Sequence, residues 1–204
     1  TTCVNLAASL IATKRRVLVI DLDPQGNTTM GSGIEKNTLK HSVLDVLTQR
    51  VDINQVVHIN TPAGYDLLPS NGDLTAAEVE LIKVNQKEAR LRLALTQLQQ
   101  DYDFVLVDCP PSLNMLTVNA LVCAHSVLVP MQCEYYALEG ISALLNTVKF
   151  IKHSLNPELV IEGILRTMYD PRNSLTNDVS HQLINHFGDL VYRTVIPRNV
   201  RLAE

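Results

Sequence analysis

The chain has 204 residues, of which 46% are hydrophobic and 19% are charged, so it can bury a substantial core and long disorder is excluded. The formal charge of −4 excludes a generally basic polyanion binder, although a local basic patch stays compatible with it. Aromatic residues make up only 4%, which disfavours proteins that bind single strands by base stacking, and the hydrophobic runs are far shorter than the ~20 residues of a bilayer span.

Helical patterns and short apolar runs of β-branched residues alternate along the chain. Because no tandem hairpins interrupt them, this alternation predicts one domain over residues 1–204, with a mostly parallel twisted sheet covered by helices on both faces in a three-layer α/β/α fold. The expected elements are a helix at 2–13, a strand at 17–20, a polar stretch at 24–40, a helix at 43–48, a strand at 65–69, one or two helices at 74–98, strands at 104–107 and 127–129, a helix at 137–154, a strand at 160–165, a helix at 177–187 and a strand at 191–196.

Two carboxylates follow the first buried strand. Asp21 and Asp23 alternate along an extended chain, so both side chains point to one side at the carboxyl end of a strand, where α/β sheets bind ligands. Pro24 stiffens the following turn. A solvated turn is the alternative interpretation, since Asp, Pro, Gly and Asn all favour turns.

A second apolar strand at 104–107 ends in Asp108 and is followed by Pro110 and Pro111. P-loop nucleotide hydrolases reach a magnesium ion with an Asp placed in this way, commonly through its water shell. An apolar strand that ends in Asp also occurs often by chance, so this segment is weak evidence alone.

Together these segments resemble the ParA/Soj family of chromosome- and plasmid-partitioning ATPases, the deviant Walker relatives of MinD. The resemblance covers essentially the whole chain and implies a P-loop NTPase-like fold. Residues 21–27 are similar to the family's first switch, and residues 108–112 to its Walker B segment and second switch. Residues 1–6 resemble those that follow its Lys-Gly-Gly-Val-Gly-Lys-Thr loop, and 132–140 and 196–202 are close to Soj-type proteins.

The resemblance implies a role for each matching residue. Asp23 positions or activates the attacking water, Asp21 lies near the phosphates, and Asp108 holds Mg²⁺ through water. Thr1 and Thr2 contact the nucleotide phosphates, and Pro197 and Asn199 border the adenine of ATP. Arg198 and Arg201 bind DNA non-specifically through its phosphates, although by composition alone a loop with solvated arginines is favoured.

The Gly-rich loop and its phosphate-binding lysine are missing from these residues, as is the strand before them, which is central in this fold. Since that loop supplies most of the electrostatic stabilisation of a triphosphate, the natural protein is expected to be an ATPase and these 204 residues to hydrolyse ATP poorly or not at all. The start at Thr1 and the end at Glu204 suggest a chain truncated at both ends.

The implied function is an ATP-dependent homodimer that coats nucleoid DNA and is released when a ParB-type partner stimulates hydrolysis. It is expected in the cytoplasm without membrane attachment, and the four cysteines are expected to be buried thiols. Two alternatives stay open: a MinD-like ATPase that cycles on membranes through a C-terminal amphipathic helix, and a nucleotide-free scaffold for DNA binding or dimerisation.

Overall fold

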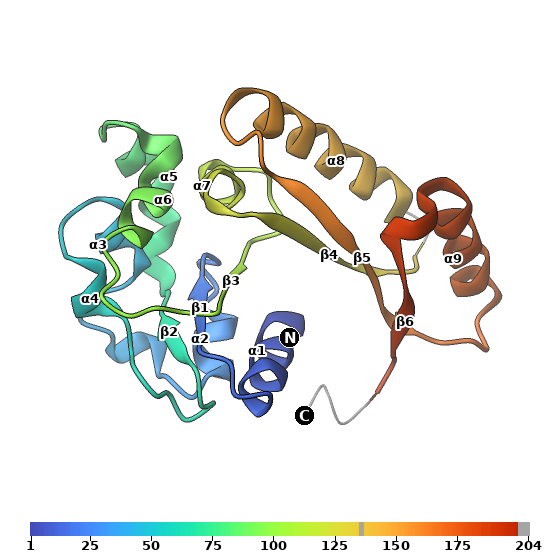
Figure 1. Ribbon diagram of the computed structural model, residues 1–204, viewed down its shortest axis with the longest axis horizontal. Helices are drawn as coiled ribbons and strands as arrows, with labels where there is room; N and C mark the ends of the chain where they lie inside the picture. Colours follow the sequence, from blue (N-terminus) through green and yellow to red (C-terminus); the bar gives the residue numbers. More distant parts are fainter. Residues whose placement is uncertain (135–136, 200–204) are drawn as a thin grey trace. The chain divides into compact units, whose positions relative to one another are not determined.

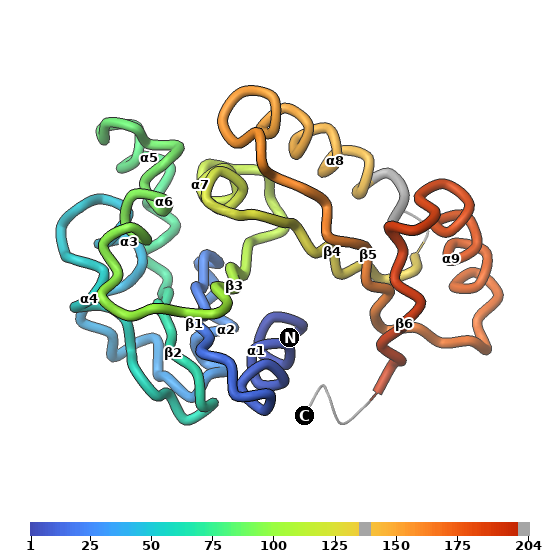
Figure 2. Tube along the Cα trace, in the orientation of Figure 1, coloured from blue at the N-terminus to red at the C-terminus, as the bar shows by residue number. Residues whose placement is uncertain are grey.

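The computed structural model describes residues 1–134 and 137–199, with the backbone alone at 137–139. These residues form two compact units, of which the first is Thr1–Cys123 and the second begins at Ala124 (Figures 1 and 2). Each unit has its own three-stranded sheet, and every pairing between the strands of a sheet is parallel.

The first unit holds three parallel strands in the order β2-β1-β3. Its elements are α1 (Thr2–Ala12), β1 (Val17–Asp21), α2 (Asn27–Gly31), α3 (Val43–Leu47), α4 (Ile53–Val56), β2 (Asp66–Leu68), α5 (Ala77–Leu81), α6 (Arg90–Leu95), β3 (Phe104–Asp108) and α7 (Met115–Cys123), with 3-10 helices at Lys36–Thr38, Gly72–Ala76 and Lys87–Ala89.

Helices cover both faces of this sheet, as the prediction of three layers requires. All five residues of β1 are buried, and their side chains alternate between two cores. Leu18 and Ile20 pack with α3, α5, α6 and α7, whereas Val17 and Val19 pack with α1. This alternation follows from the period of two along a strand.

The second unit has the strand order β4-β5-β6, and α8 and α9 share one apolar core against its sheet. Its elements are β4 (Ser126–Gln132), α8 (Ala137–Ser154), β5 (Val160–Tyr169), α9 (Ser174–Phe187), a 3-10 helix at Gly188–Leu190 and β6 (Val191–Pro197). The sequence predicts that the first of these strands ends before Pro130, but it continues to Gln132. Since β4 is an edge strand among the described strands of its sheet, the missing N–H of proline is tolerated there.

The predicted helical stretch 74–98 is interrupted in the middle. It holds two α-helices, α5 and α6, which are separated by a turn in which Gln86 has a left-handed φ of 54°. The side-chain amide of Asn119 joins this turn to α6, because its Nδ2 donates to the Lys87 carbonyl (2.8 Å) and its Oδ1 accepts from the Leu91 N–H (3.0 Å). A tertiary contact therefore fixes where α6 begins.

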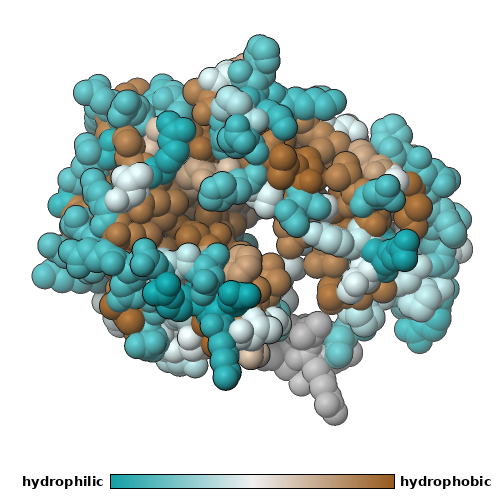
Figure 3. Space-filling view, viewed as in Figure 1, coloured by the Kyte–Doolittle hydropathy of each residue, from teal (hydrophilic) through white to brown (hydrophobic). Residues whose placement is uncertain are grey.

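On the face shown in Figure 3, hydrophilic side chains alternate with hydrophobic patches. Among the exposed hydrophobic residues are Phe104 (43%) and Val105 (39%) on β3, which is an edge strand among those described. The described helices include none that is both long and apolar enough to cross a membrane.

Candidate active site

The carboxyl ends of β1 and β3 bring two aspartates together. Asp21 is directly opposite Asp108 in the parallel register, and the Leu22 N–H continues the pairing by donating to the Asp108 carbonyl (2.8 Å). The structure thus joins the two segments, 87 positions apart along the chain, that the sequence singles out.

Asp21 is fully buried and both of its carboxylate oxygens are hydrogen-bonded. Its Oδ2 accepts from the Thr29 N–H (2.8 Å) and hydroxyl (2.7 Å), and its Oδ1 accepts from the Asp23 N–H (3.1 Å). Burial raises the pKa of Asp21, which the hydrogen bonds from Thr29 oppose. In this arrangement Asp21 anchors the loop that carries Asp23.

Asp23 is partly buried and begins a tight turn. Its Oδ1 accepts from the Gln25 N–H (2.9 Å), and its carbonyl accepts from the Gly26 N–H (2.9 Å). Gly26 has a φ of 61°, which glycine adopts without the steric cost that a side chain would add. The turn leads into α2, and the ammonium of Lys36, from the 3-10 helix at Lys36–Thr38, donates to the Gln25 carbonyl.

Asp108 is partly buried, and its Oδ2 accepts a hydrogen bond from the Thr28 hydroxyl on α2. Within the described ranges, Thr28 is the only residue with a hydrogen bond to this carboxylate, so Oδ1 can take another partner. Carboxylate oxygens suit Mg²⁺, which prefers one or two protein carboxylates and keeps several waters. The donor set at Asp108 therefore fits that ion, although the described residues form no cluster of three or more metal-binding side chains.

The N-terminus of α1 lies at the same end of the sheet. Thr1 precedes this helix and is exposed, and Thr2 is its first residue and partly buried. Cys3 has a pKa of about 12, which burial and the nearby Asp108 carboxylate raise, so the first turn of α1 lies beside that carboxylate. The unpaired N–H groups of a helix N-terminus attract anions such as phosphate.

The remaining predicted residues belong to the second unit, which is described by itself. Pro197 ends β6, and the Arg198 N–H donates to the Tyr169 carbonyl (3.0 Å), so the exposed Arg198 side chain is held beside the end of β5. Asn199 is exposed. Arg201 lies outside the described residues.

Arg198 lies near a charged pair, Asp170 and Arg172, in the loop that follows β5. Asp170 forms two hydrogen bonds with the Arg172 guanidinium, through Nε to Oδ1 (3.0 Å) and Nη2 to Oδ2 (3.0 Å). These bonds lower the pKa of Asp170 to about 2, and the positive charge of Arg198 adds to the effect. Two arginines from different segments, Arg172 after β5 and Arg198 after β6, therefore lie around the Asp170 carboxylate.

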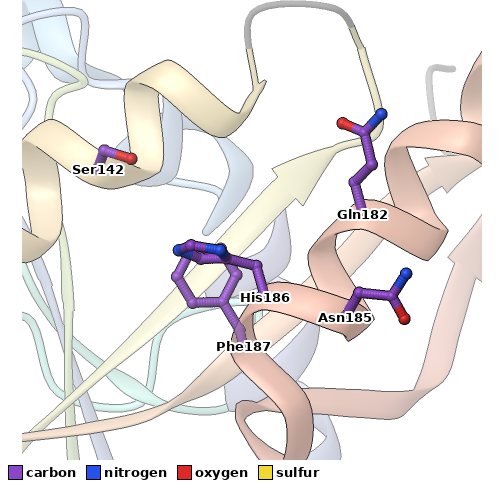
Figure 4. A pocket seen from close by; sticks show the side chains of 5 residues that line it. All are labelled: Ser142, Gln182, Asn185, His186 and Phe187. Atoms are coloured by element: carbon purple, nitrogen blue, oxygen red, sulfur yellow. The ribbon is translucent and has the colours of Figure 1, made fainter.

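A hollow of about 420 Å³ lies in the second unit (Figure 4). It is lined by Ser142 of α8 and by residues near the end of α9, namely Gln182, Asn185, His186 and Phe187. No predicted site residue lines it, and we assign it no role.

Sequence reasoning missed Thr28, Thr29 and Ser70. Thr29 and Ser70 are fully buried, and they hold the Asp23 loop through contacts between distant segments. The two threonines directly follow the Asp21–Asn27 segment, and polar residues in the first turn of a helix after a Gly could have marked them. Ser70 has no such local signal.

Comparison with known proteins agrees with this geometry. A family model described as an AAA domain matches residues 1–161. The sporulation initiation inhibitor protein Soj of Bacillus subtilis is 48% identical over all of this chain and 81% of its own length. The chromosome partitioning protein ParA of Myxococcus xanthus is 45% identical over all of this chain and 72% of its own length.

Solved structures match both units. Cobyrinic acid a,c-diamide synthase of Mycobacterium smegmatis, with bound ADP and magnesium, is 40% identical with a TM-score of 0.90, over 97% of this chain and 81% of that one. A plasmid partition protein of Borrelia burgdorferi is 27% identical with a TM-score of 0.83, over 98% of this chain and 84% of that one.

The parallel sheets, their flanking helices and the aspartates at the strand ends define an α/β protein of the P-loop NTPase class. More particularly, the chain belongs to the ParA/Soj family of partitioning ATPases.

Proposed function

We propose that this protein is a partitioning ATPase that binds Mg·ATP at the carboxyl end of the β1–β3 pair. The pairing of Asp21 with Asp108 at one sheet end, beside the N-terminus of α1 and with Asp23 hydrogen-bonded to Asp21, is the observation that carries the proposal. Asp108 holds Mg²⁺ through water, and Thr1 and Thr2 contact the phosphates. Mg²⁺ held there would supply positive charge that neutralises the charge developing on the phosphates.

In this proposal Asp23 acts on the attacking water. Its Oδ1 is engaged by the Gln25 N–H, which leaves Oδ2 to accept a proton or a hydrogen bond from that water. The side chain of Asp21 serves the loop rather than the water, because Thr29 and the Asp23 N–H occupy both of its oxygens. Asp21 is therefore linked to the phosphates only indirectly, through the position of Asp23.

We also infer that both units belong to one ATPase domain. The open edge of β3 supports this inference, because strands of parallel sheets are ordinarily covered while Phe104 and Val105 are exposed. The strand that precedes the phosphate-binding loop in this family fits that edge. Since no Gly-rich loop with a phosphate-binding lysine occurs among residues 1–204, these residues alone are expected to turn over little ATP.

The second unit supplies the groups that we assign to adenine and DNA. Pro197 and Asn199 border the adenine, and Arg198 and Arg201 contact DNA phosphates. ATP brings two copies together, the dimer binds nucleoid DNA without sequence preference, and a ParB-type partner releases it by stimulating hydrolysis. Arg172 and Arg198 around the single carboxylate of Asp170 give a net positive charge there, which supports phosphate binding.

The catalytic assignment is tested with Asp23→Asn in the complete protein. We expect the ATP turnover rate to fall by about 10²-fold or more while the Kd for ATP changes little, because only the group that acts on water is lost. Asp101→Asn, at an exposed acid of the same unit, is the matched control and should keep full turnover. Unchanged turnover in Asp23→Asn would refute the assignment.

DNA binding is tested with Arg198→Ala. Loss of one phosphate contact should weaken binding equally on unrelated sequences and reduce the slope of log affinity against log salt by about one. Arg193→Ala, at an exposed arginine within β6, is the control and should leave the affinity and the slope unchanged. An unchanged affinity and slope in Arg198→Ala would contradict the assignment.

A second candidate function comes from the 40% identity to cobyrinic acid a,c-diamide synthase, which indicates a nucleotide-dependent amide synthesis. The identity to named partitioning proteins is higher, at 45–48%. Incubation of the complete protein with ATP, cobyrinic acid and an ammonia donor separates the two functions. Amide formation would favour the synthase, and ATP-dependent retention on DNA would favour partitioning.

A further inference from the structure

A closed ring of hydrogen bonds surrounds the backbone of Asp23. Its other members are Asp21, Thr29 and Ser70, each of which has no exposed surface. They come from the end of β1, from α2 and from the residues that follow β2. Three segments of the first unit therefore meet at the one loop to which we assign catalysis.

The ring can be followed atom by atom. Asp21 Oδ1 accepts from the Asp23 N–H (3.1 Å), and Asp21 Oδ2 accepts from the Thr29 hydroxyl (2.7 Å). The same hydroxyl oxygen accepts from the Ser70 N–H (2.9 Å). The Ser70 hydroxyl then donates to the Asp23 carbonyl (2.8 Å), which closes the ring.

We propose that Ser70 and Thr29 are positioning residues for Asp23. The ring holds both polar backbone groups of Asp23, its N–H and its carbonyl, and this fixes the direction of its Cα–Cβ bond. The proposal rests on the proposed function, in which the Asp23 carboxylate acts on water. A displacement of about 1 Å in such a group can cost on the order of 10²-fold in rate.

The tight turn after Asp23 does not depend on the ring. The bonds from Gln25 N–H and Gly26 N–H to Asp23 lie within the turn, so they survive when Ser70 loses its hydroxyl. The variant loses the hydrogen bond that joins the turn to the segment after β2. Ser70→Ala should therefore leave the turn folded while its position relative to Asp108 becomes less defined.

Ser70→Ala in the complete protein is the first test. We expect kcat for ATP hydrolysis to fall by about 10- to 100-fold with little change in ATP affinity, because Ser70 fixes the position of Asp23 and contacts no substrate. Thr29→Ser keeps the hydroxyl of the ring and should retain most of the activity. Thr29→Val removes this hydroxyl and should lower kcat as Ser70→Ala does.

The control must remove a buried hydroxyl elsewhere in the same unit. Thr61 is 6% exposed, and its hydroxyl donates to the Tyr65 carbonyl (2.6 Å), outside the ring. Thr61→Val should lower thermal stability to a similar extent as Ser70→Ala and leave kcat unchanged. An equal fall of kcat in both variants, or no fall in Ser70→Ala, would overturn the proposal.

A second readout is independent of activity. Amide hydrogen exchange of the nucleotide-free protein should be at least about 10-fold faster at Asp23 in Ser70→Ala than in the wild type, and unchanged there in Thr61→Val. If Asp23→Asn keeps full turnover, the proposed function fails while this exchange still tests the ring. If Asp23→Asn is inactive and Ser70→Ala is fully active with unchanged exchange, the positioning role fails while the proposed function stands.

Discussion

The substitution Gly26→Ala probes how tightly the Asp23 loop is packed. Gly26 has a φ of 61°, and an added Cβ would lie 3.0 Å from the Ser70 carbonyl oxygen and 2.9 Å from Lys36 Cδ. A left-handed alanine costs about 1–2 kcal/mol, and overpacking adds about 1–3 kcal/mol. Alanine also restricts the unfolded chain more than glycine does, and this offsets the loss of stability by about 0.5 kcal/mol. Because the lysine side chain can move while the carbonyl cannot, we expect a net loss of about 2–3 kcal/mol.

Urea unfolding followed by far-ultraviolet circular dichroism measures this loss as a fall in the unfolding free energy, with an unchanged m-value. The matched control is Gly72→Ala, where an added Cβ meets nothing within 4 Å and φ is not left-handed. The control should change stability by less than about 0.5 kcal/mol. If Gly26→Ala is no more destabilising than Gly72→Ala, the packing that we assign to the loop is wrong.

Three further predictions concern other parts of the fold. Asn119→Ala should lower the unfolding free energy by about 2–4 kcal/mol in the same assay, because a buried amide that holds the Leu91 N–H is lost, and a loss below 1 kcal/mol would argue against that role. Gly140→Ala should raise the unfolding free energy by about 0.5–1 kcal/mol, because the added Cβ meets nothing within 4 Å and alanine favours helix α8. A decrease would show that the added Cβ clashes with a neighbouring atom. Asp170 should titrate at about 2 by carboxyl NMR, so its pair with Arg172 persists above the unfolded pKa of about 3.9 and is lost as the pH falls through about 2. Arg172→Ala should return that midpoint toward about 3.9, and no shift would contradict the assigned cause.

The alternation of strands and helices could be predicted because β1 and β3 each begin with a run of apolar residues, at 17–20 and 104–107. The two cores on either side of β1 follow from the same pattern, since Leu18 and Ile20 face one side and Val17 and Val19 the other. Helix α7 was missed, because apolar residues lie all around it and give no clear helical period. Asn114 was the available signal, as its side chain caps this helix by accepting from Leu116 N–H (3.1 Å).

The predicted aspartates were placed correctly at strand ends, but their partners could not be foreseen. Thr28 reaches Asp108 across 80 positions, and Ser70 reaches Asp23 across 47. Such bonds depend on the parallel order of the strands, which brings distant segments to one end of a sheet. The pattern of residue types in one sequence does not reveal the order of the strands in the sheet.

The ATP switch is best measured as DNA retention of the complete protein, with a non-hydrolysable ATP analogue and with ADP, across a series of salt concentrations. We expect DNA to be retained with the ATP analogue and magnesium and to be lost with ADP, and we expect the affinity to fall steeply as the salt concentration rises. Equal retention with both nucleotides, or none with either, would contradict an ATP-switched partitioning protein.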